Sequence, residues 1–249
     1  VKNAWIEKVE EQRTPLYFAE AERQLSIDPT PDSADPVALK GLYRVLIEKS
    51  DLNDIDGTVV QREVTRRLHA HRNLCEDFEE IRILDPQPVA VHARIEIGQV
   101  DDAGELLVTI YQRIAEYISP AIRFSTLSQL LAAGKRVDEI FDGPWLEHGF
   151  IDTEELRRAR RRTALRTSDL IREIMDVPGV RAVRDISIRV EGKKEPWSFD
   201  LDPAKTPKLD LASSDISLER NQLRATVNDE KVREAYIQRL RTSTTFPAL

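Results

Sequence analysis

Residues 89–97 alternate strictly between apolar and polar side chains, and this pattern restricts the fold more than any other part of the sequence. A period of two residues is that of a β-strand with one face buried and the other face in water. We therefore expect a sheet with one buried face at this point in the chain. The buried positions are predicted to be Val89, Val91, Ala93, Ile95 and Ile97.

Helical patterns flank this strand on both sides. In residues 58–78, Thr58 and Gln61 fit a capping box, and an apolar stripe follows at helical spacing. After the strand, Asp102 fits an N-cap, and the segment up to the Ser119-Pro120 break predicts a second amphipathic helix. The expected apolar face of this second helix consists of Leu107, Ile110, Ile114 and Ile118.

The rest of the chain suggests three segments. We expect residues 1–25 to be helical, with Thr14-Pro15 as a helix start, and residues 27–36 to form a linker because they hold three Pro and three Asp. The predicted organisation is an N-terminal helical segment with linker at 1–36, a core at 37–190, and a β-rich segment with a final helix at 191–249. The fold class is α+β, with small mixed or antiparallel sheets, helices packed on them, and an elongated arrangement of several subdomains.

Composition excludes several classes of protein. No stretch reaches the ~18 consecutive apolar residues of a membrane span, and no targeting leader is expected at the start. The single Cys excludes an internal disulfide and a Cys-rich zinc site. The net charge of −7 argues mildly against nucleic acid as the main ligand.

No catalytic motif is present. There is no phosphate-binding loop, dinucleotide fingerprint, nucleophile elbow or zinc-protease helix. His71 and Cys75 have the spacing of half a zinc site, but both lie on the predicted apolar stripe, so we interpret them mainly as core residues. We expect no cofactor, no metal and no enzymatic activity. An enzyme built from scattered carboxylates and His148 remains a minor alternative.

Six Arg residues between positions 157 and 166 form the strongest compositional signal. We place them on a long helix over residues 153–175, around which they would be distributed on all sides. Such a helix fits a solvated surface or a protein interface, and it also supports an alternative function as a nucleic-acid-binding module. The candidate protein-interface residues are Arg157, Arg158, Arg160, Arg161, Arg162 and Arg166, together with Trp145 and His148.

Three stretches carry a resemblance to a known family. They are residues 66–78 with the strand that follows, the helix end at 115–120, and residues 138–151 with the later segments 168–171 and 177–180. In this order they resemble the baseplate J-like proteins of contractile phage tails and of phage-tail-like extracellular injection systems. The resemblance covers residues 59–190, and residues 209–227 fit loosely. The long connection over residues 127–150 is closer to the injection-particle branch.

The resemblance implies a structural function. A chain of this family would be a baseplate wedge subunit that assembles into a sixfold ring around the hub and spike and couples triggering to sheath contraction. Its implied partners are other wedge subunits, hub and spike proteins and sheath-proximal proteins, without nucleic acid or a membrane span. The particle would assemble in the bacterial cytoplasm and then be released or tethered. Family members are usually longer, so we expect this chain to be part of a longer one.

Overall fold

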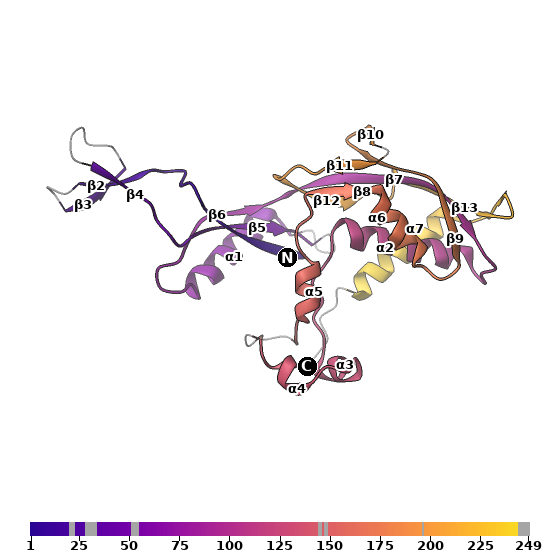
Figure 1. Cartoon of the computed structure of the whole chain (residues 1–249), viewed down its shortest axis with the longest axis horizontal. Coiled ribbons are helices and arrows are strands. Elements are labelled where there is room, and N and C mark those ends of the chain that lie inside the picture. Colours follow the sequence, from indigo (N-terminus) through magenta and orange to yellow (C-terminus); the bar gives the residue numbers. More distant parts are fainter. Residues whose placement is uncertain are drawn as a thin grey trace. The chain divides into compact units, whose positions relative to one another are not determined.

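The computed structural model describes residues 1–19, 23–27, 34–50, 55–143, 146, 149–195 and 197–243. The chain divides into two compact units, Val1–Leu84 and Asp85–Leu249 (Figure 1). The expected α+β class with small mixed sheets is confirmed. The expected division at residues 36 and 190 stays a prediction.

The first unit contains a three-stranded sheet in the order β1-β5-β6. β1 is antiparallel to β5, and β5 is parallel to β6 through the crossover helix α1. Val64 and Leu68 of α1 pack against the buried Val45, Ile47 and Ile81 of the sheet. A second sheet has the order β3-β2-β4. The elements are β1 (Asn3–Lys8), β2 (Leu16–Ala19), β3 (Gln24–Ser26), β4 (Ala34–Val37), β5 (Leu42–Glu48), α1 (Gly57–Ala70) and β6 (Asp77–Ile83).

The expected helix over residues 1–25 is wrong, because this segment forms strands. β1 pairs with β5 along its whole length, from Asn3 opposite Glu48 to Lys8 opposite Tyr43. The buried Asn3 side chain donates a hydrogen bond of 2.8 Å to the Glu48 carboxylate, which Lys2 also contacts at 2.7 Å. Pairing with a strand forty residues away therefore decides the local structure. Much of the expected linker at 27–36 lies outside the described residues.

Helix α1 is also shorter than expected. The Asp56 carboxylate accepts a hydrogen bond from the Thr58 N–H, so the helix begins one residue before the predicted cap. It ends at Ala70, and both His71 and Cys75 are exposed. Our interpretation of His71 and Cys75 as core residues is therefore wrong. Phe78, expected on the same helix, belongs to β6.

The second unit contains a six-stranded sheet built around the long strand β7, which confirms the alternating strand of the sequence. One edge of β7 pairs with β9 in the antiparallel sense, and the other edge pairs with β12 and then β13 in the parallel sense. β10 and β14 extend the sheet at its two ends, in the order β10-β9-β7-β13-β14. The strands of this sheet are β7 (Asp85–Ile97), β9 (Val180–Val190), β10 (Lys193–Glu195), β12 (Lys205–Leu209), β13 (Asp215–Arg220) and β14 (Leu223–Arg224). β8 (Ala164–Arg166) and β11 (Ser198–Asp200) pair with each other in a separate two-stranded sheet.

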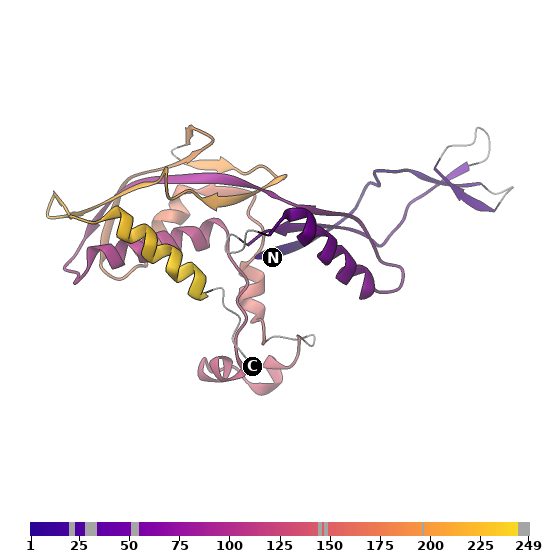
Figure 2. The ribbon, with the colours of Figure 1, turned by 180° about the vertical axis from the view of Figure 1, so that it is seen from behind.

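Helices α2, α6 and α7 cover one face of this sheet, and α2 and α7 lie side by side (Figures 1 and 2). Val89, Val91 and Ile95 of β7 pack in the same buried core as Ile110 and Ile114 of α2. All of these side chains are almost fully removed from water, as the two periodicities predicted. The helices of the unit are α2 (Ala103–Ile118), α3 (Leu127–Ala132), α4 (Val137–Ile140), α5 (Thr153–Arg158), α6 (Thr167–Met175) and α7 (Asp229–Ser243).

A tight turn joins α6 to β9. Gly179 has a φ of +101°, which favours glycine, and a Cβ atom at this position would lie 2.7 Å from Val100 Cγ1. In this turn the Gly179 carbonyl accepts a hydrogen bond of 2.8 Å from the Gly98 N–H. This bond holds the start of β9 beside the end of β7. The predicted helix end at residue 175 agrees with the structure, in which α6 ends at Met175.

Candidate protein interface

The predicted long Arg helix over residues 153–175 is wrong. Helix α5 stops at Arg158, the chain then passes through irregular residues and the short strand β8, and α6 begins at Thr167. Asp152 caps α5, and its carboxylate accepts a hydrogen bond from the Glu154 N–H. The buried Ala159 ends this helix. The Arg run is therefore divided between a helix, a connection and a strand.

Two of the Arg side chains bind the chain's own backbone. Arg162 donates a hydrogen bond from Nε to the Tyr117 carbonyl near the end of α2, and its guanidinium lies 4.1 Å from the centre of the Tyr117 ring. Arg161 donates to the carbonyls of Pro203 and Lys205, the latter at 3.1 Å. Carbonyls at a helix C-terminus lack partners within the helix, so a cation there is stabilising.

Tyr117 links this connection to α6. Its hydroxyl accepts a hydrogen bond from the Arg166 N–H at 3.1 Å and lies 3.2 Å from an Asp169 carboxylate oxygen. Burial raises the pKa of the Tyr117 phenol above its ordinary value. The hydroxyl therefore stays protonated at neutral pH and can donate a hydrogen bond to Asp169. Arg162, Tyr117 and Asp169 thus hold α2 and α6 together.

The other expected interface residues lie in different places. The exposed Arg157 forms an ion pair of 2.7 Å with Glu154, and Arg160 and Arg166 are exposed. Arg158 lies in α5, while Trp145 and His148 lie outside the described residues. A role of these Arg residues in partner contacts stays a prediction.

An apolar surface that we did not predict lies on the connection between α2 and α5. Helices α3 and α4 pack on each other and bury Leu130 and Ile140. Phe141 packs edge-to-face on Phe150 at 5.1 Å between ring centroids, yet it stays 57% exposed. This short helical segment with exposed apolar side chains is therefore a candidate docking surface. We call this surface the apolar arm, and its exposed side chains are Leu127, Leu131, Val137 and Phe141.

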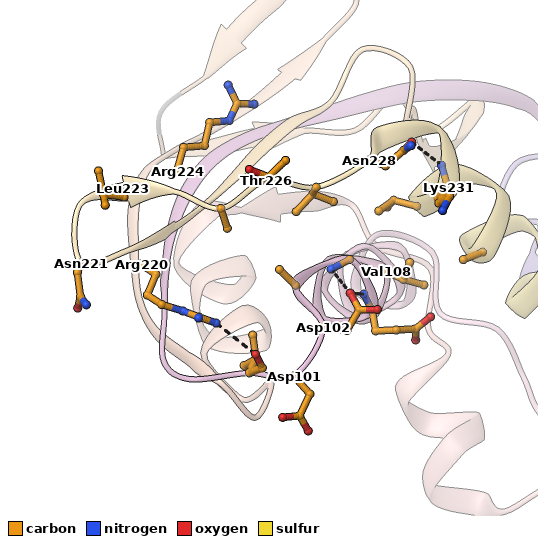
Figure 3. Close-up of a pocket in the computed structure, with 18 residues that line it drawn as sticks. Asp101, Asp102, Val108, Arg220, Asn221, Leu223, Arg224, Thr226, Asn228 and Lys231 are labelled. Atoms are coloured by element: carbon orange, nitrogen blue, oxygen red, sulfur yellow. Dashed lines mark hydrogen bonds between the residues drawn. The ribbon is translucent and has the colours of Figure 1, made fainter.

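A groove of about 790 Å³ lies where the β13–β14 hairpin meets the N-terminal turns of α2 and α7 (Figure 3). Arg220 crosses from β13 and donates to the carbonyls of Gly98 and Val100 at 3.1 and 3.2 Å. Asp102 caps α2, and its carboxylate accepts from the Gly104 N–H at 2.7 Å. The apolar side chains that line the groove are Val100, Ala103, Val108, Leu223, Ala225, Val227, Val232 and Ala235.

Only single features of this groove can be recognised in the sequence. Asp102 was a predicted cap and caps α2, and the turn between β13 and β14 has positive φ values at Asn221 and Gln222. These features lie more than a hundred residues apart in the chain, so their meeting could not be predicted.

In the described part of the chain, no three His, Cys, Asp or Glu side chains gather as a metal ion would require. Within the same residues, no helix has the length and apolar character needed to cross a membrane.

The chain is thus an α+β domain with exposed apolar side chains on α3 and α4 and a groove beside the β13–β14 hairpin. Comparison with known families then places it. Residues 85–228 match the family model described as baseplate wedge Pvc12-like domain 3, and the chain therefore belongs to this family of baseplate wedge proteins from contractile injection systems.

A solved structure has a similar fold. It is a chain of the anti-feeding prophage baseplate, determined by cryo-electron microscopy with sixfold symmetrisation, with 20% sequence identity and a TM-score of 0.59. The match covers 99% of this chain and 44% of that chain, so this chain spans less than half the length of the baseplate protein. A search of curated proteins gives no match.

Proposed function

We propose that the chain is a structural wedge subunit that holds neighbouring subunits in a sixfold baseplate ring around the hub and spike. In this role it would couple triggering to sheath contraction, with other wedge subunits and sheath-proximal proteins as partners. Membership of the baseplate wedge family over residues 85–228 is the observation that carries the proposal. We also propose that the chain acts without catalysis and joins the particle in the bacterial cytoplasm.

The apolar arm supports a role in assembly. Leu131 is 44% exposed and Phe141 is 57% exposed, although a core lies within the same unit. Covering such side chains on association is favourable by about 25 cal/mol per Å² of apolar area removed from water. The alternative of a nucleic-acid-binding helix has lost its main support, because the Arg run is not a continuous helix and Arg161 and Arg162 bind the backbone.

Affinity purification from the native producing cells tests the proposal. A tagged copy of this chain should copurify with other baseplate subunits, and negative-stain electron microscopy of the eluate should show sheathed tubes. A tagged chain that elutes alone, from cells whose lysate contains such particles, would refute the proposal.

A further inference from the structure

The small sheet β3-β2-β4 of the first unit has one exposed apolar face. Phe18 pairs with Leu25 on one side and with Asp35 on the other, and directly paired residues share a face of the sheet. Leu16 and Val37, two positions along, lie on the same face. Phe18 is 37% exposed and Leu25 is 58% exposed, and neither hydrophobic core of the described residues includes them. We call these five side chains the β2–β4 face.

The chain around this face is acidic. Residues 7–36 hold eight Asp or Glu residues and three Lys or Arg residues. One of these cations, Arg13, forms an ion pair of 2.6 Å with Glu80. Asp35 on the face and Glu10 and Glu11 before β2 are exposed. Two such faces packed on each other would bring like charges together, which is unfavourable. The β2–β4 face therefore favours a partner surface that is apolar and basic.

The second unit carries a surface with both properties. Trp197, between β10 and β11, is 80% exposed. Its backbone is nevertheless fixed, because the Trp197 carbonyl accepts hydrogen bonds of 3.0 Å from both the N–H and the Oγ1 of Thr167. An exposed Trp on a fixed backbone loses little freedom on binding and is the residue type that most often dominates an interface.

Four exposed cations lie on the strands that lead to and pair beside Trp197. Lys193 and Lys194 are in β10, Arg189 is opposite Lys194 in β9, and Arg166 in β8 is opposite Ser198. Among the residues that the structure describes, none of these four side chains has an ion-pair partner. We call Trp197 with these four cations the Trp197 surface. Its charge is complementary to that of the β2–β4 face.

We propose that the β2–β4 face of one copy of this chain packs on the Trp197 surface of a second copy. Trp197 lies against Phe18 and Leu25, and the cations lie beside Asp35 and its acidic neighbours. The contact joins two different surfaces of one chain, so it is heterologous, and repetition by rotation closes a ring. This inference rests on the proposed function, because the ring places copies of the chain around one axis.

Photocrosslinking in assembled particles tests the inference. Benzoylphenylalanine replaces Trp197 in one variant and, as a control, the 94% exposed Leu74 in another. We expect only the probe at 197 to give a product with the mass of two copies, in which mass spectrometry finds the probe joined to residues 14–39. A product with the mass of one copy, a product with another protein or another segment, or no product in intact particles would overturn the inference.

Two neighbouring residues of β3 provide a matched pair of variants. Leu25 lies on the β2–β4 face, whereas Gln24, also exposed, points to the other side of the sheet. Leu25→Ser should lower the yield of the two-copy product about tenfold, the effect of about 1.4 kcal/mol, while Gln24→Ser preserves it. Equal yields in the two variants, both shown to be folded by circular dichroism, would contradict the proposed contact. If the unmodified tagged chain enters no particles, the proposed function fails instead.

Discussion

At the scale of single residues, Arg162 illustrates how a side chain suited to a partner contact can serve the fold instead. It lies over the Tyr117 ring and donates to a carbonyl near the end of α2. Arg160, two residues earlier, is exposed. Arg160 and Arg162 are the same residue type in the same connection, but only Arg162 is partly buried, so the two can be compared as variants.

We expect Arg162→Ala to lower the free energy of unfolding by about 2 kcal/mol, because a charge-assisted hydrogen bond and a cation–π contact are lost. Arg160→Ala should change it by less than about 0.5 kcal/mol. Urea denaturation followed by circular dichroism measures both. Equal stabilities of the two variants would show that the Arg162 contact is not stabilising.

His92 makes stability depend on pH. Its Nε2 atom is buried and has no hydrogen-bond partner in the described structure. Burial, followed by the positive charges of Arg189 and Lys194, lowers the pKa of His92 below its ordinary value of 6.5, while Asp215 opposes this shift. The unfolded chain therefore binds a proton at a higher pH than the folded chain does.

Acidification from pH 7 to pH 5 should consequently lower the free energy of unfolding, and stability should return as the pH rises above 6.5. His92→Gln should reduce this pH dependence, because the side chain no longer titrates. Urea denaturation at several pH values provides the measurement. An unchanged pH profile in His92→Gln would exclude His92 as its source.

At the scale of secondary-structure elements, truncating apolar side chains should lower stability in α2 but not in the apolar arm. Ile114 is fully buried against β7, so Ile114→Ala should cost about 2–5 kcal/mol of stability. Leu131 in α3 is 44% exposed, so Leu131→Ala should leave the unfolding transition nearly unchanged.

Particle assembly, unlike stability, should depend on the exposed side chains of the apolar arm. We expect Leu131→Ala combined with Phe141→Ala to reduce incorporation into particles, measured by copurification of the other subunits, while the variant stays folded. Normal incorporation of this double variant would exclude the apolar arm as a docking surface.

The elements also show what local sequence can and cannot predict. β7 and α2 were predicted correctly because each has a clear period and a recognisable boundary, such as the Asp102 cap. The N-terminal strands and the interruption after α5 were missed because their causes are distant. β1 depends on β5, and Arg162 turns inward to meet Tyr117, 45 residues earlier. The groove likewise forms only when residues 100–108 meet residues 220–235.

At the scale of the whole molecule, each unit has a hydrophobic core of its own. The core of the second unit includes α2, β7, β9 and α7, all of which lie after residue 84. We therefore expect residues 85–249 to fold when expressed alone, with a single cooperative thermal transition by circular dichroism. A fragment that lacks such a transition would show that the first unit is needed for folding.

The most direct test of the central claim is a cryo-electron microscopy reconstruction of particles that carry a tagged copy of this chain. We expect density for this α+β fold repeated around the axis at the baseplate end of a sheathed tube, with the apolar arm covered by a neighbouring subunit. Particles whose baseplates lack this density, or a copy in which the apolar arm faces solvent, would contradict the proposed function.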